Sequence, residues 1–176
     1  MLGADDRTGV AVLLPVAKMV IHFSTFSGKI KLVFTVEEEA GLVGASKVDE
    51  YFLWGTHATI VVERRGTSDI VTSCLGTIPF CEDGYGEFIE QVAKEADLTD
   101  WKCTQGGSSD TIIWASHGIQ SINLSVGYYH EHTDAECLDI RACYKTTQLL
   151  RMFLEKEREL VRTLRMMWRK RMDCAN

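Results

Sequence analysis

The sequence of 176 residues lacks three features that would tie it to a membrane, a secretory route or a nucleic acid. It has no run of about 18 apolar residues, the length that a membrane-spanning helix needs. It has no apolar leader at its start, because Asp5, Asp6 and Arg7 follow Met1 closely. Its net charge of −6 gives no excess of the Lys and Arg that bind phosphates. We therefore expect a cytoplasmic protein with no transmembrane segment and no nucleic-acid partner.

The chain also lacks a CxxC pair, an internal repeat and a low-complexity linker. A chain of this length can bury a core without covalent cross-links. The six scattered cysteines are therefore expected to be reduced, structural thiols, with disulfide bonds as the alternative. One globular domain follows from this organisation.

Short, apolar, β-branched segments alternate with segments of helical periodicity. The segments lack the polar-out alternation of a sheet with one solvated face, and they predict strands that are buried on both sides. This pattern favours a three-layer α/β fold with a mostly parallel sheet and helices on both faces. The predicted strands are 30–36, 58–62, a strand beginning at Asp69, and 119–126; the main predicted helices are 10–21, 86–96 and about 139–172.

Four loops next to the predicted strands and helices carry clustered acidic residues or histidines. Singly, each loop has an ordinary explanation. Acidic residues at positions 5 and 6 favour a helix N-terminus, adjacent glutamates are commonly solvated, and a lone histidine commonly lies at the surface. Glu63 is harder to explain in this way, because it ends an apolar strand where an unpaired charge is costly to desolvate. The loops are 3–9, 37–41, 63–66 and 127–136.

Taken together, the four loops indicate a metal site. Carboxylates that converge at one edge of a sheet repel one another, and cations offset that repulsion. Oxygen ligands combined with a histidine suit zinc, manganese or cobalt. Two adjacent glutamates after a strand can divide the work, one binding metal and the other accepting a proton from water, which is the arrangement of metal-assisted hydrolysis.

The order of these loops resembles that of the co-catalytic zinc exopeptidases, a superfamily of aminopeptidases, carboxypeptidases and related amide hydrolases; the resemblance spans about residues 2–140. The segment Gly-Ala-Asp-Asp-Arg-Thr-Gly resembles the one that carries the bridging aspartate, which implies Asp5 as a metal ligand followed by a cis peptide bond. The segment Glu-Glu-Ala-Gly-Leu-Val-Gly-Ala implies Glu38 as the general base and Glu39 as a ligand. Glu63 matches the next ligand, an Asp or Glu after a strand.

The last ligand is implied by His-Thr-Asp-Ala-Glu, which resembles His-Ser/Thr-x-x-Glu. It assigns the role to His132, with His130 as the alternative, while the segment 106–110 resembles a structural or site-lining segment of the family. The resemblance implies hydrolysis of peptides or small amides with one or two zinc ions, or manganese or cobalt in their place. Aminopeptidase activity is expected, and the glutamate at position 63 leaves a carboxypeptidase or deacylase preference open.

The sequence departs from the family in one ligand. The family's first histidine, in a His-x-Asp motif, would have to precede Asp5. By resemblance, Asp5, Glu39 and His132 complete one metal position, while Asp5 and Glu63 provide only part of the other. We expect a sheet that lacks the family's N-terminal strands and exposes an unpaired edge. The chain is then a fragment, one half of a split peptidase completed by an N-terminal fragment, or a short relative that serves in binding or assembly with impaired activity.

Residues 1–155 are expected to form the zinc-peptidase-like domain, and residues 156–176 a basic amphipathic tail. The helical pattern of the tail suits a membrane surface or a partner helix. The alternative, which we favour, is a terminal helix that packs on its own domain or on a second copy in a homo-oligomer.

Overall fold

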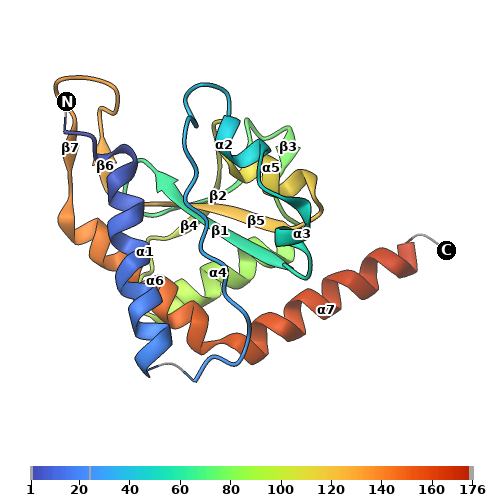
Figure 1. Cartoon of the computed structure of the whole chain (residues 1–176). Coiled ribbons are helices and arrows are strands. Elements are labelled where there is room, and N and C mark those ends of the chain that lie inside the picture. The colour runs from blue at the N-terminus through green and yellow to red at the C-terminus, as the bar shows by residue number, and fades with distance from the viewer. Residues whose placement is uncertain (1, 24, 175–176) are drawn as a thin grey trace.

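A mixed β-sheet forms the centre of the computed structural model, which describes residues 2–23 and 25–174 (Figure 1). The strand order is β1-β5-β2-β3, and β4 also pairs with β2. A separate ladder joins β6 and β7. The strands are β1 (Ala58–Arg64), β2 (Asp69–Cys74), β3 (Ile78–Pro79), β4 (Lys102–Gly106), β5 (Gln120–Ser125), β6 (Tyr128–Tyr129) and β7 (Cys137–Leu138).

The prediction of a mostly parallel sheet was not confirmed. β1 pairs with β5 and β2 pairs with β4 in parallel, but β2 runs antiparallel to both β5 and β3. The cause lies in the loop 65–68, which joins β1 to β2. A parallel return needs a crossover of about a dozen residues or more, and so short a loop can only reverse the chain direction.

Helices pack against both sides of this sheet. α1, α4 and α6 contact β1, β2 and β5 respectively, and α5 contacts both β1 and β5. In Figure 1, α1, α4, α6 and α7 lie on one side of the strands, and α2, α3 and α5 lie on the other. The helices are α1 (Ala4–Phe23), α2 (Val43–Ser46), α3 (Glu50–Leu53), α4 (Asp83–Glu95), α5 (Thr111–Ser116), α6 (Ile140–Glu155) and α7 (Glu157–Cys174).

The main core lies between β5 and the helices α1, α4 and α6. Every residue of β5 is buried, because that strand sits between β1 and β2 with helices over its faces. Tyr85 and Ile89 of α4 are fully buried, as are Ile122 and Leu124 of β5, and Trp101 is 1% exposed. This burial explains why the apolar periodicity of these two elements is readable from the sequence.

The predicted strand 30–36 is wrong as a paired strand. The segment is extended, but no backbone hydrogen bond joins residues 28–35 to any other residue in the part of the chain that the structure describes. It is held by side chains instead. The Lys31 ammonium bonds the carbonyl oxygens of Phe52 and Trp54 and the Thr56 hydroxyl, and the Thr35 hydroxyl donates to Asp110 at 2.5 Å. A strand prediction based on local composition cannot supply the neighbouring backbone that a ladder requires.

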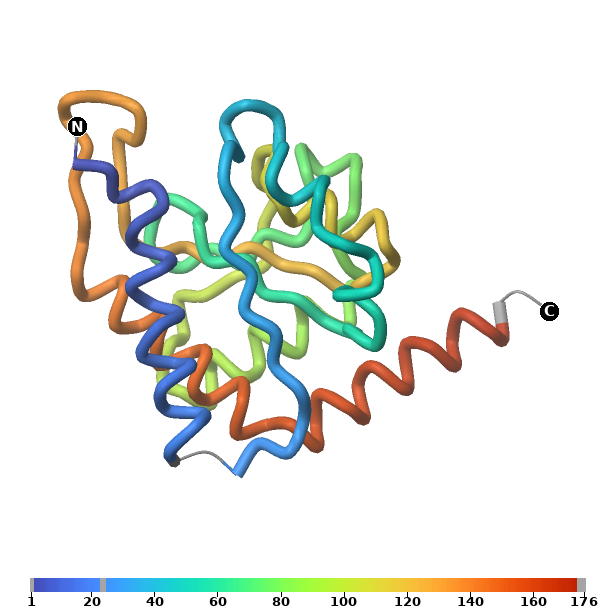
Figure 2. Tube along the Cα trace, viewed as in Figure 1, coloured from blue at the N-terminus to red at the C-terminus, as the bar shows by residue number. Residues whose placement is uncertain are grey.

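The long helix predicted at the C-terminal end is two helices. α6 ends at Glu155 and α7 begins at Glu157, and the Lys156 between them forms an ion pair with Glu95. Figure 2 shows α7 turning away from α6 and extending beyond the body of the protein. One face of α7 packs on the body through the buried side chains of Leu160 and Met167.

None of the helices in residues 2–23 and 25–174 combines the length and hydropathy of a transmembrane segment. The cysteine side chains that the structure describes, all except Cys174, are free thiols: Cys74, Cys81, Cys103, Cys137 and Cys143.

Candidate metal centre

Three of the predicted ligands converge at one point. One oxygen of Asp5, one oxygen of Glu39 and one ring nitrogen of His132 all lie within 4.8 Å of one another. The Nε2 atom of His132 lies 2.6 Å from Glu39 Oε1 and 3.2 Å from Asp5 Oδ2. The three residues come from the start of α1, the turn before α2 and the β6–β7 loop, so the fold rather than sequence proximity brings them together.

Asp5 is positioned by Glu136. The Glu136 carboxylate accepts the backbone N–H groups of Gly3 at 2.6 Å, Ala4 at 2.9 Å and Asp5 at 3.2 Å. Asp5 and Asp6 have non-helical dihedral angles, and the peptide bond between them is cis, as the family resemblance implied. The Asp6 carboxylate accepts the N–H of Gly9 at 2.9 Å, which caps the regular part of α1. The side chain of Asp5 is therefore directed away from the helix and toward the β6–β7 loop.

His132 lies on the β6–β7 loop, where both His130 and His132 have positive φ angles. Its side chain is 56% exposed, and the neighbouring Glu131 is tied to Arg65 by an ion pair of 2.9 Å. Desolvation lowers the pKa of the imidazole, but the carboxylates of Glu39 and Asp5 outweigh this and raise it. The structure therefore favours His132 as the member of the acidic cluster, while His130, the alternative ligand, is not part of it.

Glu38 and Glu39 occupy the turn after the extended segment. The turn is closed by backbone hydrogen bonds from Gly41 and Leu42 to the Glu38 carbonyl oxygen and from Gly44 to Val36. Burial, together with the charges of Glu39, Asp110 and Asp5, raises the pKa of Glu38 to about 7. Glu38 lines the cleft beside the cluster without being part of it.

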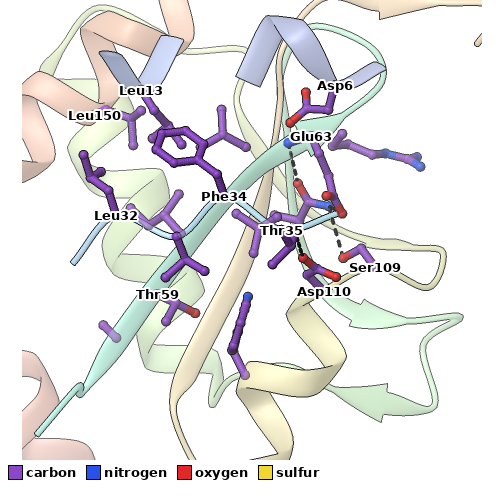
Figure 3. Close-up of a pocket in the computed structure, with 18 of the residues that line it drawn as sticks. Asp6, Leu13, Leu32, Phe34, Thr35, Thr59, Glu63, Ser109, Asp110 and Leu150 are labelled. Carbon is purple, nitrogen blue, oxygen red and sulfur yellow. Dashed lines mark hydrogen bonds between the residues drawn. The ribbon is translucent and has the colours of Figure 1, made fainter. Parts of the chain in front are cut away.

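Glu63 lies near the end of β1, close to Glu38 but outside the three-residue cluster. Burial, reinforced by the charges of Glu38, Asp110 and Asp6, raises the pKa of Glu63 to about 8. Its carboxylate accepts a hydrogen bond from the Asn123 amide at 3.3 Å. Asn123 in turn donates to the Ser109 hydroxyl. Figure 3 labels Glu63 and Ser109, the two residues that Asn123 joins.

Several polar residues of the site were not predicted. The predicted site-lining segment 106–110 does line the cleft, but sequence reasoning did not single out Asp110, whose Oδ1 atom is buried without a partner. It also did not assign Tyr128, whose hydroxyl donates to the Glu63 carbonyl oxygen, or Glu136. The only sequence signal for Glu136 was its place in the His-Thr-Asp-Ala-Glu motif. That motif does not predict which N–H groups donate hydrogen bonds to the carboxylate.

The electrostatics of this site fit a cation. Burial is the largest cause that raises the pKa values of Asp5, Asp6, Glu38, Glu63 and Asp110, and all but the last are raised further by the charge of at least one neighbouring carboxylate. A divalent ion would offset both the burial and the repulsion. Two carboxylate oxygens and an imidazole nitrogen form a donor set that zinc, manganese and cobalt accept.

The fold is that of aminopeptidases of known structure. The aminopeptidase PepT from Bacillus cereus is 18% identical and superposes with a TM-score of 0.78, over 89% of this chain and 72% of PepT. BSAP, a zinc aminopeptidase from Bacillus subtilis, is 22% identical with a TM-score of 0.67, over 88% of this chain and 42% of BSAP.

The chain belongs to the M42 glutamyl aminopeptidase family, whose model matches residues 3–149. The uncharacterized protein YqjE of Bacillus subtilis (strain 168) is 40% identical over 75 residues, which is 40% of this chain and 20% of YqjE. The chain thus spans less than half the length of both YqjE and BSAP.

Proposed function

We propose that this chain is a metal-dependent hydrolase of peptide or small amide bonds with aminopeptidase-like specificity. The observation that carries the proposal is the convergence of Asp5, Glu39 and His132, with Glu38 beside them. Family membership supports the same reaction class.

Each residue has a role in this proposal. Asp5, Glu39 and His132 would hold the first ion, and Asp5 and Glu63 would supply only part of the ligands for a second. Zinc fits this set, and manganese or cobalt can replace it. When bound, a divalent ion polarises the scissile carbonyl group and makes water more acidic.

Glu38 acts as the general base and then as the general acid. Its carboxylate, with a pKa of about 7, accepts a proton from the attacking water and returns it to the leaving amine. A catalytic pKa close to the working pH keeps both the accepting and the donating forms accessible. Glu37 is next to it in sequence but is exposed and outside the cluster, and it has no role in the proposed reaction.

The proposal extends to the organisation of the chain. Residues 1–155 would form the catalytic domain, with three layers and without the family's N-terminal strands, and residues 156–176 would form the basic tail. The exposed Trp168 and Met172 on α7 support homo-oligomer formation through the tail. The free thiols support a cytoplasmic location.

A second candidate function is supported by the unpaired extended segment 30–36. In this alternative the chain is one half of a split peptidase or a non-catalytic assembly module, and hydrolysis is impaired in the chain alone. A carboxypeptidase or deacylase preference is the alternative within the enzyme class.

Metal content and a matched pair of variants test the proposal. We expect purified protein to bind zinc, manganese or cobalt, and added metal to raise its melting temperature. We expect Glu38→Gln to abolish hydrolysis of amino-acid anilides while metal content stays near that of the wild type, and Glu37→Gln to change neither. A protein that binds none of these metals is not a metallohydrolase, and full activity in Glu38→Gln rules out the general-base role. If metal binds but the wild-type chain does not hydrolyse anilides, the second candidate is favoured.

A further inference from the structure

The outer edge of β1 presents backbone groups that nothing in the described structure pairs. β1 is bonded on one side only, to β5. In a parallel pair, alternate residues direct their N–H and C=O groups to opposite sides. The carbonyl oxygen of His57 accepts the backbone N–H of Gln120 in β5, so His57 faces β5. Because the direction alternates along the strand, Ala58 and Ile60 direct their backbone N–H and C=O groups to the opposite edge. No partner for these groups exists among residues 2–23 and 25–174.

The extended segment 30–36 presents a second backbone edge, which within the described part of the chain is unpaired from Ile30 to Thr35 and ends where the Val36 carbonyl oxygen accepts the Gly44 N–H. Its side chains alternate between more and less exposed positions, as in a strand, with Ile30, Leu32, Phe34 and Val36 all exposed. Side chains anchor it near both ends, through Lys31 and Thr35, so it is extended without being part of a ladder. It therefore has the conformation of a strand but lacks a neighbour.

The two edges run in the same direction over the same length. The Lys31 ammonium donates to the Thr56 hydroxyl at 3.0 Å, just before β1. At the other end, Glu38 lies close enough to Glu63, near the end of β1, for the two carboxylates to repel each other. The separation from 31 to 38 equals the separation from 56 to 63, so the segments are in parallel register. The Lys31 side chain bridges the two segments at one end, whereas the backbones of the two segments are not hydrogen-bonded to each other.

A cavity of about 1360 Å³ is lined by both segments, and this volume includes the metal cleft at one end. A seven-residue strand would fill roughly 1,100 Å³, if it is about 23 Å long, takes about 4.8 Å of sheet width and about 10 Å of sheet thickness. Figure 3 shows Leu13, Leu32, Phe34 and Leu150 toward one end of the cavity and the polar groups of Glu63 and Asp110 toward the other. The apolar part is lined mainly by side chains of α1, α6, α7 and the two edges: Leu13, Val16, Val20, Leu150, Phe153 and Leu164.

We propose that this cavity is a binding slot for one β-strand, about seven residues long and apolar, supplied by polypeptide other than residues 1–176. The strand would pair with Ala58 and Ile60 of β1 on one side and with the segment 30–36 on the other. A strand buried between paired neighbours and helices is apolar throughout, which matches the lining. Solved relatives such as BSAP are more than twice the length of the matched part, so their polypeptide exceeds what this chain contains.

Backbone pairing favours a polypeptide strand over other occupants. An apolar small molecule would cover the side chains but leave the N–H and C=O groups of both edges unpaired in an apolar setting, which costs free energy. A strand would form hydrogen bonds with the backbone N–H and C=O groups of both edges, and it would extend the sheet from β1 to the segment 30–36. The same cavity reaches the metal cleft at Glu38 and His132, but the two proposals have separate readouts. Amide exchange tests the slot, whereas metal content and anilide hydrolysis test the proposed reaction.

Hydrogen–deuterium exchange tests the slot. The probe is a peptide of seven alternating valine and isoleucine residues flanked by lysines, and its matched control carries N-methyl groups at alternate residues, which removes hydrogen-bond donors. In the chain alone, the amides of residues 30–34 and of Ala58 and Ile60 are expected to exchange as unprotected groups. The probe should slow this exchange at least about tenfold, and the control peptide should not.

A pair of variants makes the outcome specific. Leu32→Asp places a charge in the slot and should abolish protection by the probe, whereas Ile21→Asp, at an exposed position of α1 that does not line the cavity, should leave it intact. Circular dichroism checks that both variants are folded. The proposal is overturned if these amides are already protected in a monomer, which would mean that 30–36 closes on β1, or in a dimer, which would mean that a second copy fills the slot. Unprotected edges that the probe does not protect overturn it as well.

Discussion

The hydrogen bonds that Glu136 accepts predict a large effect of a residue that does not belong to the metal cluster. Its carboxylate binds three backbone N–H groups of residues 3–5, and His132 lies only four positions earlier on the same loop. Glu136 therefore ties together the two segments that carry Asp5 and His132. Glu136→Gln keeps one acceptor oxygen, but it removes the charge and turns an NH₂ group toward either the Gly3 donor or the Ala4 and Asp5 donors, because the two carboxylate oxygens divide these bonds between them.

We expect Glu136→Gln to weaken zinc binding by about 10- to 100-fold, the usual effect of removing a group that orients a metal ligand. Competition for zinc with a chromophoric chelator measures this change. Glu90→Gln is the matched control, because Glu90 also accepts a backbone N–H, that of Cys103 at 2.8 Å, but lies on α4 outside the metal cleft. A zinc dissociation constant in Glu136→Gln equal to that of the control would refute the positioning role.

Two further predictions concern stability. Burial raises the pKa values of Asp6 and Glu63 to about 8, well above their ordinary values. Between about pH 4.5 and 8 the unfolded chain loses these protons while the folded chain keeps them, so without metal the free energy of unfolding should fall as pH rises through this window. Urea unfolding in a chelator at several pH values measures the slope, which Glu63→Gln should reduce, and a flat profile would contradict the shifts. Gly9→Ala should destabilise the fold by about 1–3 kcal/mol, because its Cβ would overlap the Val62 carbonyl oxygen, whereas Gly107→Ala, where a Cβ meets nothing within 4 Å, should melt at the wild-type temperature.

The sequence was sufficient for elements whose signals are local. α4, β1 and β5 were predicted because their apolar residues follow the period of the element and pack into one core. The cluster of Asp5, Glu39 and His132 was found through motif order, and the structure brings these three residues together. Their assignment as metal ligands stays a prediction until metal content is measured.

The features that the sequence did not predict depend on contacts between distant segments. The segment 30–36 has strand composition, but a ladder requires a neighbouring backbone, which composition does not reveal. The break at Lys156 lies inside an uninterrupted helical period, and the ion pair with Glu95 that accompanies it joins residues about 60 positions apart. Glu136 contacts residues 3–5 only because the fold brings together segments that are 133 positions apart in the sequence.

The two metal positions should differ in affinity for a structural reason. The first position has three ligand atoms that already lie within 4.8 Å of one another, from Asp5, Glu39 and His132. Glu136 also holds the backbone N–H of Asp5. Glu63 lies outside this cluster, on a strand whose outer edge is unpaired. Because the second position has only the carboxylates of Asp5 and Glu63, we expect titration with zinc to show one tight ion before a much weaker second.

Variants at the two positions separate these ions. His132→Ala should remove the tight phase of the zinc titration, because it takes away the nitrogen donor of the complete set. Glu63→Gln should remove only the weak phase, because its carboxylate does not belong to that set. Loss of the tight phase in Glu63→Gln would show instead that the first ion depends on β1.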